Sequence, residues 1–314
     1  MAITHSSGSA GALKPRKQNK QRSNTLIYHL LLLPGILILV IFNVLPMIGS
    51  VMAFQDFIPS RGIFGSEWVG WENFRFMFIL PDSRTIFVNT LIIAFGKIIF
   101  SLLASLVFAL LLHEVRNAFY KRSLQTVVYL PHFLSWVILA GVVQFILAQE
   151  GMLNQLLSMF GIDGPIWLSS NVWFRLILII THVWKEFGFG AIIFLAALTG
   201  INPSLYEAAE IDGANRWHKL LFVTLPGIAP IITLVAALSI GGILSAGFEQ
   251  VFNLYNPLVY PTGDVIDTWV YRAGLLDAQY SLAAAVGLLQ SVAAFILILI
   301  SYYLAYRYAD YRIF

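Results

Sequence analysis

Residues 86–112 read IFVNTLIIAFGKIIFSLLASLVFALLL, and Lys97 is the only charged side chain among them. About 20 consecutive apolar residues are enough for an α-helix to cross the hydrocarbon core of a bilayer. The stretch therefore predicts a membrane-spanning helix. The whole chain agrees with this, because 59% of its 314 residues are hydrophobic and 11% are charged, against about 45–50% and about 25% in soluble domains.

The sequence holds five further stretches of this kind. The six predicted spans cover residues 27–53, 86–112, 124–148, 172–199, 226–248 and 281–306. The predicted fold is an all-α integral membrane protein, with residues 1–25 as a flexible basic tail and residues 26–314 as one transmembrane domain. A cleaved signal peptide is the alternative for the first stretch, but its apolar run continues to about Phe54 and exceeds the usual h-region of about 7–15 residues.

Basic residues predict the orientation, because Lys and Arg are enriched in cytoplasmic loops. A cytoplasmic N-terminus places twelve basic residues inside: Lys14, Arg16, Lys17, Lys20, Arg22, Arg116, Lys121, Arg122, Arg216, Lys219, Arg307 and Arg312. It leaves four outside: Arg61, Arg75, Arg84 and Arg272. Both termini are therefore predicted to be cytoplasmic. Nucleic-acid binding by the basic run at 14–22 is an alternative that its place before a span disfavours.

The predicted inner loop at residues 200–225 contains the sequence NPSLYEAAEIDGANRW at 202–217. Asn202 is a good N-cap, Pro203 suits the first helical turn, and Gly213 suits a helix end. Leu205, Ala208, Ala209 and Asp212 follow the i, i+3, i+4, i+7 spacing of one helix face. We expect a short helix, a glycine corner and a second helix that together form a docking segment. An ordinary capped connecting helix is the alternative.

The longer run EAAEIDGANRWHKLLFVTLPGIAP at 207–230 resembles the EAA motif of binding-protein-dependent ABC permeases. The places of the family pattern are filled by Glu207, Ala208, Ala209, Gly213, Val223, Leu225 and Pro226, with Val223 where Ile is usual. In that family the loop is a coupling helix that docks in a groove of a cytoplasmic ATPase. The resemblance implies an ATPase-coupling role for Glu207, Ala208, Ala209, Asp212, Gly213, Ala214 and Arg216.

Other segments resemble the oligosaccharide branch of that family, namely VGWENF at 69–74, GMLN at 151–154 and GFEQVF at 247–252. The resemblance implies the six-helix fold of a type I ABC importer permease in a bacterial inner membrane. It implies as partners a second homologous permease, two ATPase subunits, an extracytoplasmic solute-binding protein and an oligosaccharide substrate. ATP and Mg²⁺ would bind the ATPases, and no cofactor is expected in this chain. The extra N-terminal spans and large insertion of the larger maltose-type subunit are missing from the sequence.

Lys185 and Glu186 lie midway along the predicted span 172–199. Ionisable residues at membrane depth are rare and usually face a bundle interior or a wet cavity. The pair is therefore a candidate for the translocation path. The alternatives are a structural ion pair, or a lysine bonded to carbonyls of a broken helix.

A second candidate group follows the predicted fifth span and consists of Glu249, Gln250, Asn253 and Asn256, together with the aromatic Tyr255. Polar side chains of this kind, next to aromatic rings, suit sugars because hydroxyls both donate and accept hydrogen bonds. A polar outer rim that contacts the binding protein is the alternative.

Three rival functions remain open at this point. The first is an importer of the same architecture for a non-sugar solute. The second is an ion-coupled secondary transporter with Lys185 and Glu186 as a proton relay, and the third is a membrane scaffold that docks a cytoplasmic partner. The sequence has no G-x-x-x-x-G-K-[ST] run, so the energy for transport is expected to come from a partner.

Overall fold

The computed structural model describes the backbone of residues 18–309 and the side-chain environment of residues 27–303. The chain divides into two compact units, Met1–Val51 and Met52–Phe314. Residues 1–17 of the predicted tail lie outside the described residues, and helix α1 begins at Gln18.

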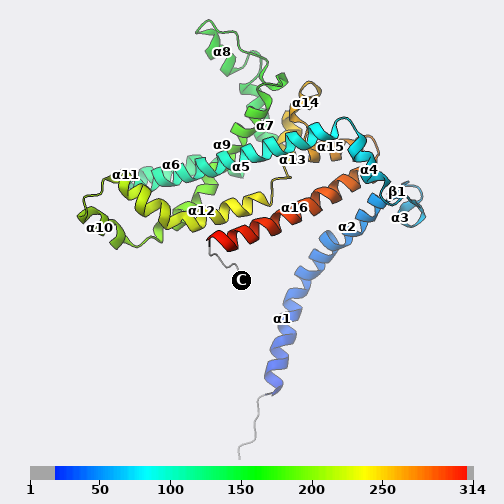
Figure 1. The fold of residues 1–314 in the computed structure, drawn as a ribbon, viewed down its shortest axis with the longest axis horizontal. Coiled ribbons are helices and arrows are strands. Elements are labelled where there is room, and N and C mark those ends of the chain that lie inside the picture. The colour runs from blue at the N-terminus through cyan, green and yellow to red at the C-terminus, as the bar shows by residue number, and fades with distance from the viewer. Residues whose placement is uncertain (1–17, 310–314) are drawn as a thin grey trace, which may run out of the picture. The chain divides into compact units, whose positions relative to one another are not determined.

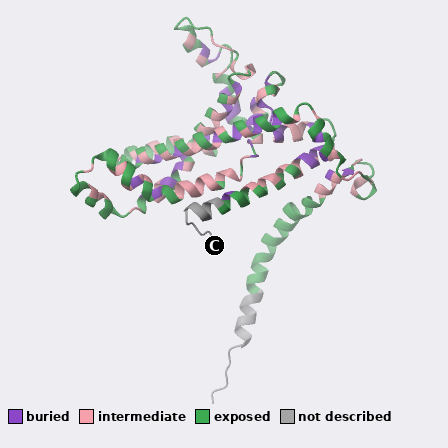
Figure 2. Cartoon of the chain, in the orientation of Figure 1, coloured by how far each residue is buried: buried purple, intermediate pink, exposed green. Residues whose placement is uncertain are grey.

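The first unit contains α1 (Gln18–Leu39), a π-helical turn (Val40–Val44) and α2 (Leu45–Met47), and the 3₁₀ turn Ile48–Phe54 begins in it. Every residue from 27 to 48 is exposed (Figure 2). A helix that is apolar on all sides needs lipid or protein around it. This finding agrees with a membrane span at Ile27–Phe54.

The second unit contains the remaining long helices (Figure 1). Helices long and apolar enough to cross a membrane are α5 (Ser83–Glu114), α9 (Phe174–Thr199), the continuous segment Arg216–Ile240 and α16 (Tyr280–Ala309). With the first span these make five such helices among the described residues, or six if one bent pair is counted as a span.

The predicted third span, 124–148, is not one continuous helix. The chain forms α6 (Ala118–Tyr129) and a 3₁₀ turn (Leu130–Phe133), then α7 (Trp136–Ile146), and the two parts are bent by 104°. Pro131 lacks the N–H that a continuing helix needs. The Ser135 hydroxyl then accepts from the backbone N–H of Ile138 at 3.4 Å and caps the new helix.

The predicted fifth span, 226–248, has different bounds in the structure. Helix α11 (Arg216–Lys219) continues through a π-helical turn (Leu220–Thr224) into α12 (Leu225–Ile240). The helix ends at Ile240, and Gly247 has a φ of +85° just before α13 (Phe248–Leu254). A left-handed backbone at Gly247 suits only glycine well, and residues 241–244 form a turn where the predicted span would continue as helix.

Short elements complete the second unit. Strand β1 (Gln55–Asp56) pairs antiparallel with β2 (Glu67–Trp68). The short helices are α3 (Gly62–Gly65), α4 (Glu72–Ile79), α8 (Met152–Ser158), α10 (Pro203–Ile211), α14 (Tyr260–Gly263) and α15 (Ile266–Tyr271).

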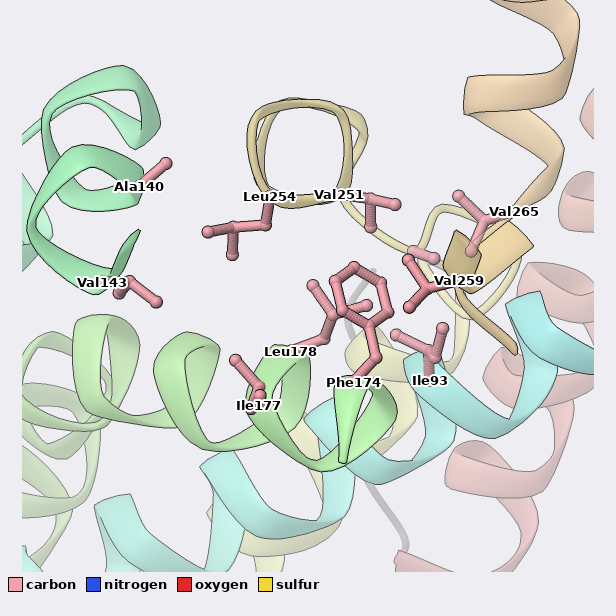
Figure 3. Packing of buried hydrophobic residues seen from close by; sticks show 11 residues of the cluster. Ile93, Ala140, Val143, Phe174, Ile177, Leu178, Val251, Leu254, Val259 and Val265 are labelled. Atoms are coloured by element: carbon pink, nitrogen blue, oxygen red, sulfur yellow. The ribbon is translucent and has the colours of Figure 1, made fainter. Parts of the chain in front are cut away.

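The core of the second unit forms where α5 lies along α9 and α12 lies along α16. Figure 3 shows Phe174 and Leu178 of α9 pointing toward Ile93 of α5 and Val251 of α13. Small residues allow close approach in membrane helices. A Cβ on Gly188 of α9 would lie 2.5 Å from the backbone carbonyl oxygen of Val128, so glycine is required where α9 crosses α6.

Candidate coupling loop and translocation path

Helix α10 is capped at both ends by its own sequence. The Asn202 side chain accepts from the backbone N–H of Ser204 at 3.0 Å. At the other end Gly213 has a φ of +77°, and its N–H donates to the carbonyl of Glu210 at 3.0 Å. The N–H of Ala214 donates to the carbonyl of Ala209 at 2.9 Å. These two bonds form a Schellman motif, so the glycine corner predicted from the sequence has a defined geometry.

The chain then starts a second helix within three residues. Asn215 caps it, because its side chain accepts from the backbone N–H of His218 at 2.9 Å. This helix is the one that continues through α12 to Ile240. The corner therefore joins α10 directly to a membrane-spanning helix.

Two side-chain contacts tie α10 to that spanning helix across the corner. The hydroxyls of Tyr206 and Thr224 are hydrogen-bonded at 3.0 Å, and Thr224 is buried. The ammonium of Lys219 lies 3.3 Å from the carboxylate of Glu210. Neither pair stands out in the sequence, because the partners are separated by 18 and 9 positions with no shared periodicity.

The outer surface of the loop carries both polar and apolar groups. Of the residues predicted to couple to an ATPase, Ala209 and Ala214 are half-buried, and the exposed ones are Glu207, Ala208, Asp212, Gly213 and Arg216. Ile211 is 87% exposed and Trp217 is 70% exposed. Both large apolar side chains are accessible to a partner protein, and the sequence reasoning did not single them out.

Lys185 and Glu186 contact the break in the bent pair α6–α7. The Lys185 ammonium donates to the carbonyl oxygen of His132 at 2.6 Å and to that of Pro131 at 3.5 Å. The Glu186 carboxylate lies 2.8 Å from Nδ1 of His132 and 3.7 Å from the Lys185 ammonium. The His132 ring stacks on Phe189 with centroids 4.0 Å apart. This geometry corresponds to the alternative of a lysine bonded to carbonyls of a broken helix.

Lys97 of α5 makes a comparable contact with the segment that follows the fifth span. Its ammonium is buried and donates to the carbonyl oxygen of Ala246 at 2.5 Å. No described acidic side chain lies within ion-pair distance of it. Lys97 and Lys185 therefore each supply a donor to a backbone carbonyl at a helix break, Lys97 to Ala246 and Lys185 to His132, as buried polar groups require.

The four candidates after the fifth span do not gather around one point. Gln250 is fully buried and donates to the Leu178 carbonyl at 2.8 Å and to the Thr181 hydroxyl at 2.7 Å. Asn256 donates to the carbonyl of Leu168 at 3.0 Å. Glu249 and Asn253 lie on α13 with Gln250. The Asn253 side chain donates to the backbone carbonyl of Glu249 at 2.7 Å, and the Glu249 side chain is exposed.

An aromatic row, of which only Tyr255 was predicted from the sequence, lies along α13 to α15. Phe252 is at its centre, with its ring 5.1 Å from Phe248, 4.9 Å from Tyr271 and 6.0 Å from Tyr255. Tyr255 in turn lies 5.3 Å from Tyr260. The spacing of four residues between Phe248 and Phe252 is the sequence signal that could have revealed it.

The row ends at an ion pair outside the spans. The Arg272 guanidinium lies 4.3 Å from the Tyr260 ring and is hydrogen-bonded to the buried carboxylate of Asp264. Burial alone would lower the pKa of Arg272, but the hydrogen bonds and charge of Asp264 outweigh it and raise that pKa. Burial raises the pKa of the Tyr255 phenol, and Tyr260 adds to the effect. Arg272 thus stays charged and Tyr255 stays neutral at physiological pH.

Comparison with known proteins agrees with this architecture. A family model described as "Binding-protein-dependent transport system inner membrane component" matches residues 101–314. Protein LplB of Bacillus subtilis (strain 168) is 41% identical over 281 residues, which cover 89% of this chain and 88% of LplB. The polygalacturonan/rhamnogalacturonan transport system permease protein YteP of the same organism is 38% identical over 283 residues, 90% of this chain and 88% of YteP.

A solved structure also matches. In the crystal structure of a bacterial alginate ABC transporter in complex with an alginate pentasaccharide-bound periplasmic protein, one chain superposes with a TM-score of 0.85. The two are 37% identical, and the match covers 94% of this chain and 99% of that chain. The chain is thus a multi-pass transport subunit and not an enzyme, and it belongs to the family of inner membrane components of binding-protein-dependent transport systems.

Proposed function

We propose that this chain is one permease of an ABC importer that moves an oligosaccharide or polysaccharide fragment across the cytoplasmic membrane of a bacterium. A second homologous permease would complete the pathway, two ATPase subunits would bind ATP and Mg²⁺, and an extracytoplasmic protein would deliver the sugar. The observation that carries the proposal is the capped coupling loop, whose exposed Ile211 and Trp217 suit a protein contact and whose helix continues into a membrane span.

The rigidity of the loop supports its coupling role. The Schellman motif at Gly213 and the tie between Tyr206 and Thr224 hold α10 at a fixed angle to the spanning helix. When the ATPases close on ATP, α10 moves with them and α12 follows. Glu207, Asp212 and Arg216 are exposed on this loop and would supply its polar contacts. Both termini would be cytoplasmic, which places the coupling loop on the side of the ATP.

The substrate class is supported by the relatives. YteP is named for polygalacturonan and rhamnogalacturonan, and the solved transporter is named for alginate, an acidic polysaccharide. Aromatic faces stack on sugar rings, and guanidinium groups bind carboxylates. The aromatic row from Phe248 to Tyr260 provides the aromatic faces, whereas the adjacent Arg272 is already paired with Asp264. We place the outer part of the sugar path along this row.

ATPase activity of the complex in nanodiscs tests the proposal. The complex is co-purified through this chain and assayed alone, with empty binding protein, and with binding protein loaded with uronate or neutral oligosaccharides. We expect one loaded sugar to stimulate hydrolysis. If no ATPase co-purifies, the coupling role is wrong; if hydrolysis responds to a non-sugar solute only, the substrate class is wrong.

The sugar path has its own test. Phe252→Ala removes the centre of the aromatic row, whereas Phe160→Ala removes an exposed aromatic ring outside it. We expect Phe252→Ala to raise the sugar concentration needed for half-maximal uptake and Phe160→Ala to leave it unchanged. Equal values for Phe252→Ala and the unmodified transporter would remove the row from the path.

A further inference from the structure

A groove of about 590 Å³ lies between the start of α5 and the middle of α16. Its walls are formed mainly by apolar side chains, among them Ile86, Phe87, Val286, Leu289, Ala293 and Ile296. The volume falls in the range of about 300–1,000 Å³ that small-molecule sites occupy. In a membrane-spanning bundle, a long apolar groove of this size fits a hydrocarbon chain.

Polar groups border the groove at few places, and most of them are already bonded. Gln290 donates to the Leu244 carbonyl at 2.7 Å and to the Asp267 carboxylate at 2.9 Å. The Ser83 hydroxyl donates to the carbonyl of Met77. Arg84 differs, because it is exposed and its guanidinium forms no ion pair or side-chain hydrogen bond with the described residues. The groove thus presents one uncompensated cation.

The position of Arg84 determines what kind of anion it meets. It lies in the first turn of α5, a helix that spans the membrane, so it is at the level of the lipid headgroups whichever way the chain is oriented. The N-terminus of a helix also carries partial positive charge. Asp82, the N-cap residue, makes no capping hydrogen bond and no ion pair with Arg84. An anion from outside the chain is therefore expected, and phosphate is the common one at this depth.

We propose that the groove binds a phospholipid, with the phosphate on the Arg84 guanidinium and one acyl chain along α16. Arginine suits phosphate because its planar fork donates two parallel hydrogen bonds. The apolar groove and the cation are both needed for such a ligand, whereas a packed protein helix would require only the groove. The proposal rests on the groove and Arg84 alone and stands apart from the identity of the transported solute.

Native mass spectrometry of the assembled transporter tests the proposal. The complex is reconstituted with phosphatidylglycerol or with diacylglycerol of the same chains and then released from the membrane mimetic. We expect phosphatidylglycerol to be retained and diacylglycerol to be lost. Arg84→Gln removes the charge-assisted hydrogen bonds, so retention should fall about tenfold. Arg61→Gln is the matched control, since Arg61 is an exposed arginine outside the groove.

A second variant tests the groove itself. Ala293→Phe fills it from α16, whereas Ser291→Phe adds the same ring two residues away, outside the lining. We expect Ala293→Phe to lose the lipid and Ser291→Phe to keep it, with both complexes intact. Equal lipid retention by unmodified, Arg84→Gln and Ala293→Phe complexes would overturn the proposal. A photo-crosslinker at Val292 that labels another protein subunit in place of lipid would also overturn it.

Discussion

The ammonium of Lys185 lies 2.6 Å from the carbonyl oxygen of His132, at the bend where α6 and α7 diverge by 104°. The same residue pair is joined again through Glu186, which contacts both the lysine and the His132 ring. A charged group buried at this depth is tolerated only when it is bonded. The lysine therefore stabilises the bent conformation of the third hydrophobic segment.

Replacing Lys185 by Met should destabilise the protein more than it alters sugar affinity. The carbonyl of His132 would lose its donor, at a cost of about 1–3 kcal/mol. We expect a lower thermal unfolding midpoint in nanodiscs and an unchanged sugar concentration for half-maximal uptake. Lys121→Met is the control, because that lysine of α6 forms no ion pair with the described residues. An unchanged midpoint with weaker sugar uptake would instead assign Lys185 to the translocation path.

Gln250 and Glu249 are neighbours with opposite environments, so they form a matched pair for mutation. Gln250 is fully buried and bonded to α9, and Glu249 is exposed. Gln250→Glu would bury either an ionised carboxylate, which donates neither bond, or a protonated carboxyl, which keeps at most one of them, for a loss of several kcal/mol. Glu249→Gln should change the unfolding midpoint little. The measurement is the thermal unfolding midpoint of each variant. Equal midpoints for Gln250→Glu and Glu249→Gln would contradict the structural role of Gln250.

Gly213→Ala should impair coupling. The φ of +77° costs a residue with a Cβ about 1–2 kcal/mol, so α10 would turn away from its capped geometry. ATP-driven uptake into proteoliposomes should fall sharply while the permease still inserts. Gly141→Ala is the control, since Gly141 lies inside α7 with no atom within 4 Å of an added Cβ. Full uptake by Gly213→Ala would show that the corner geometry is dispensable.

Ile211→Asp should weaken binding of the ATPase subunits without unfolding the permease. An exposed apolar side chain at the centre of a protein contact typically contributes about 2 kcal/mol or more. We expect loss of ATPase on co-purification, with an unchanged unfolding midpoint for the permease. Phe64→Asp is the control, because Phe64 is fully exposed in α3, away from the coupling loop. Retained ATPase in Ile211→Asp would place the docking surface elsewhere.

Hydrophobicity alone predicted most of the fold, because a bilayer requires long apolar helices. It did not predict the bend between α6 and α7, since a broken span has the same composition as a continuous one. The capped corner at Gly213 was predictable because its cap residues are adjacent in sequence. The partners of Lys185 and Gln250 were not, because they come from residues that only the packing of separate helices brings together.

The rigid corner also has a geometric consequence. Beyond it, the continuous helix Arg216–Ile240 has 25 residues and is about 37 Å long at about 1.5 Å per residue. A rotation of about 10° at the loop would then carry its far end through an arc of about 6 Å. That end leads to Ala246, whose carbonyl Lys97 of α5 holds. A movement of the coupling loop would thus be passed to α5 through this hydrogen bond when the turn at residues 241–247 moves with the helix end.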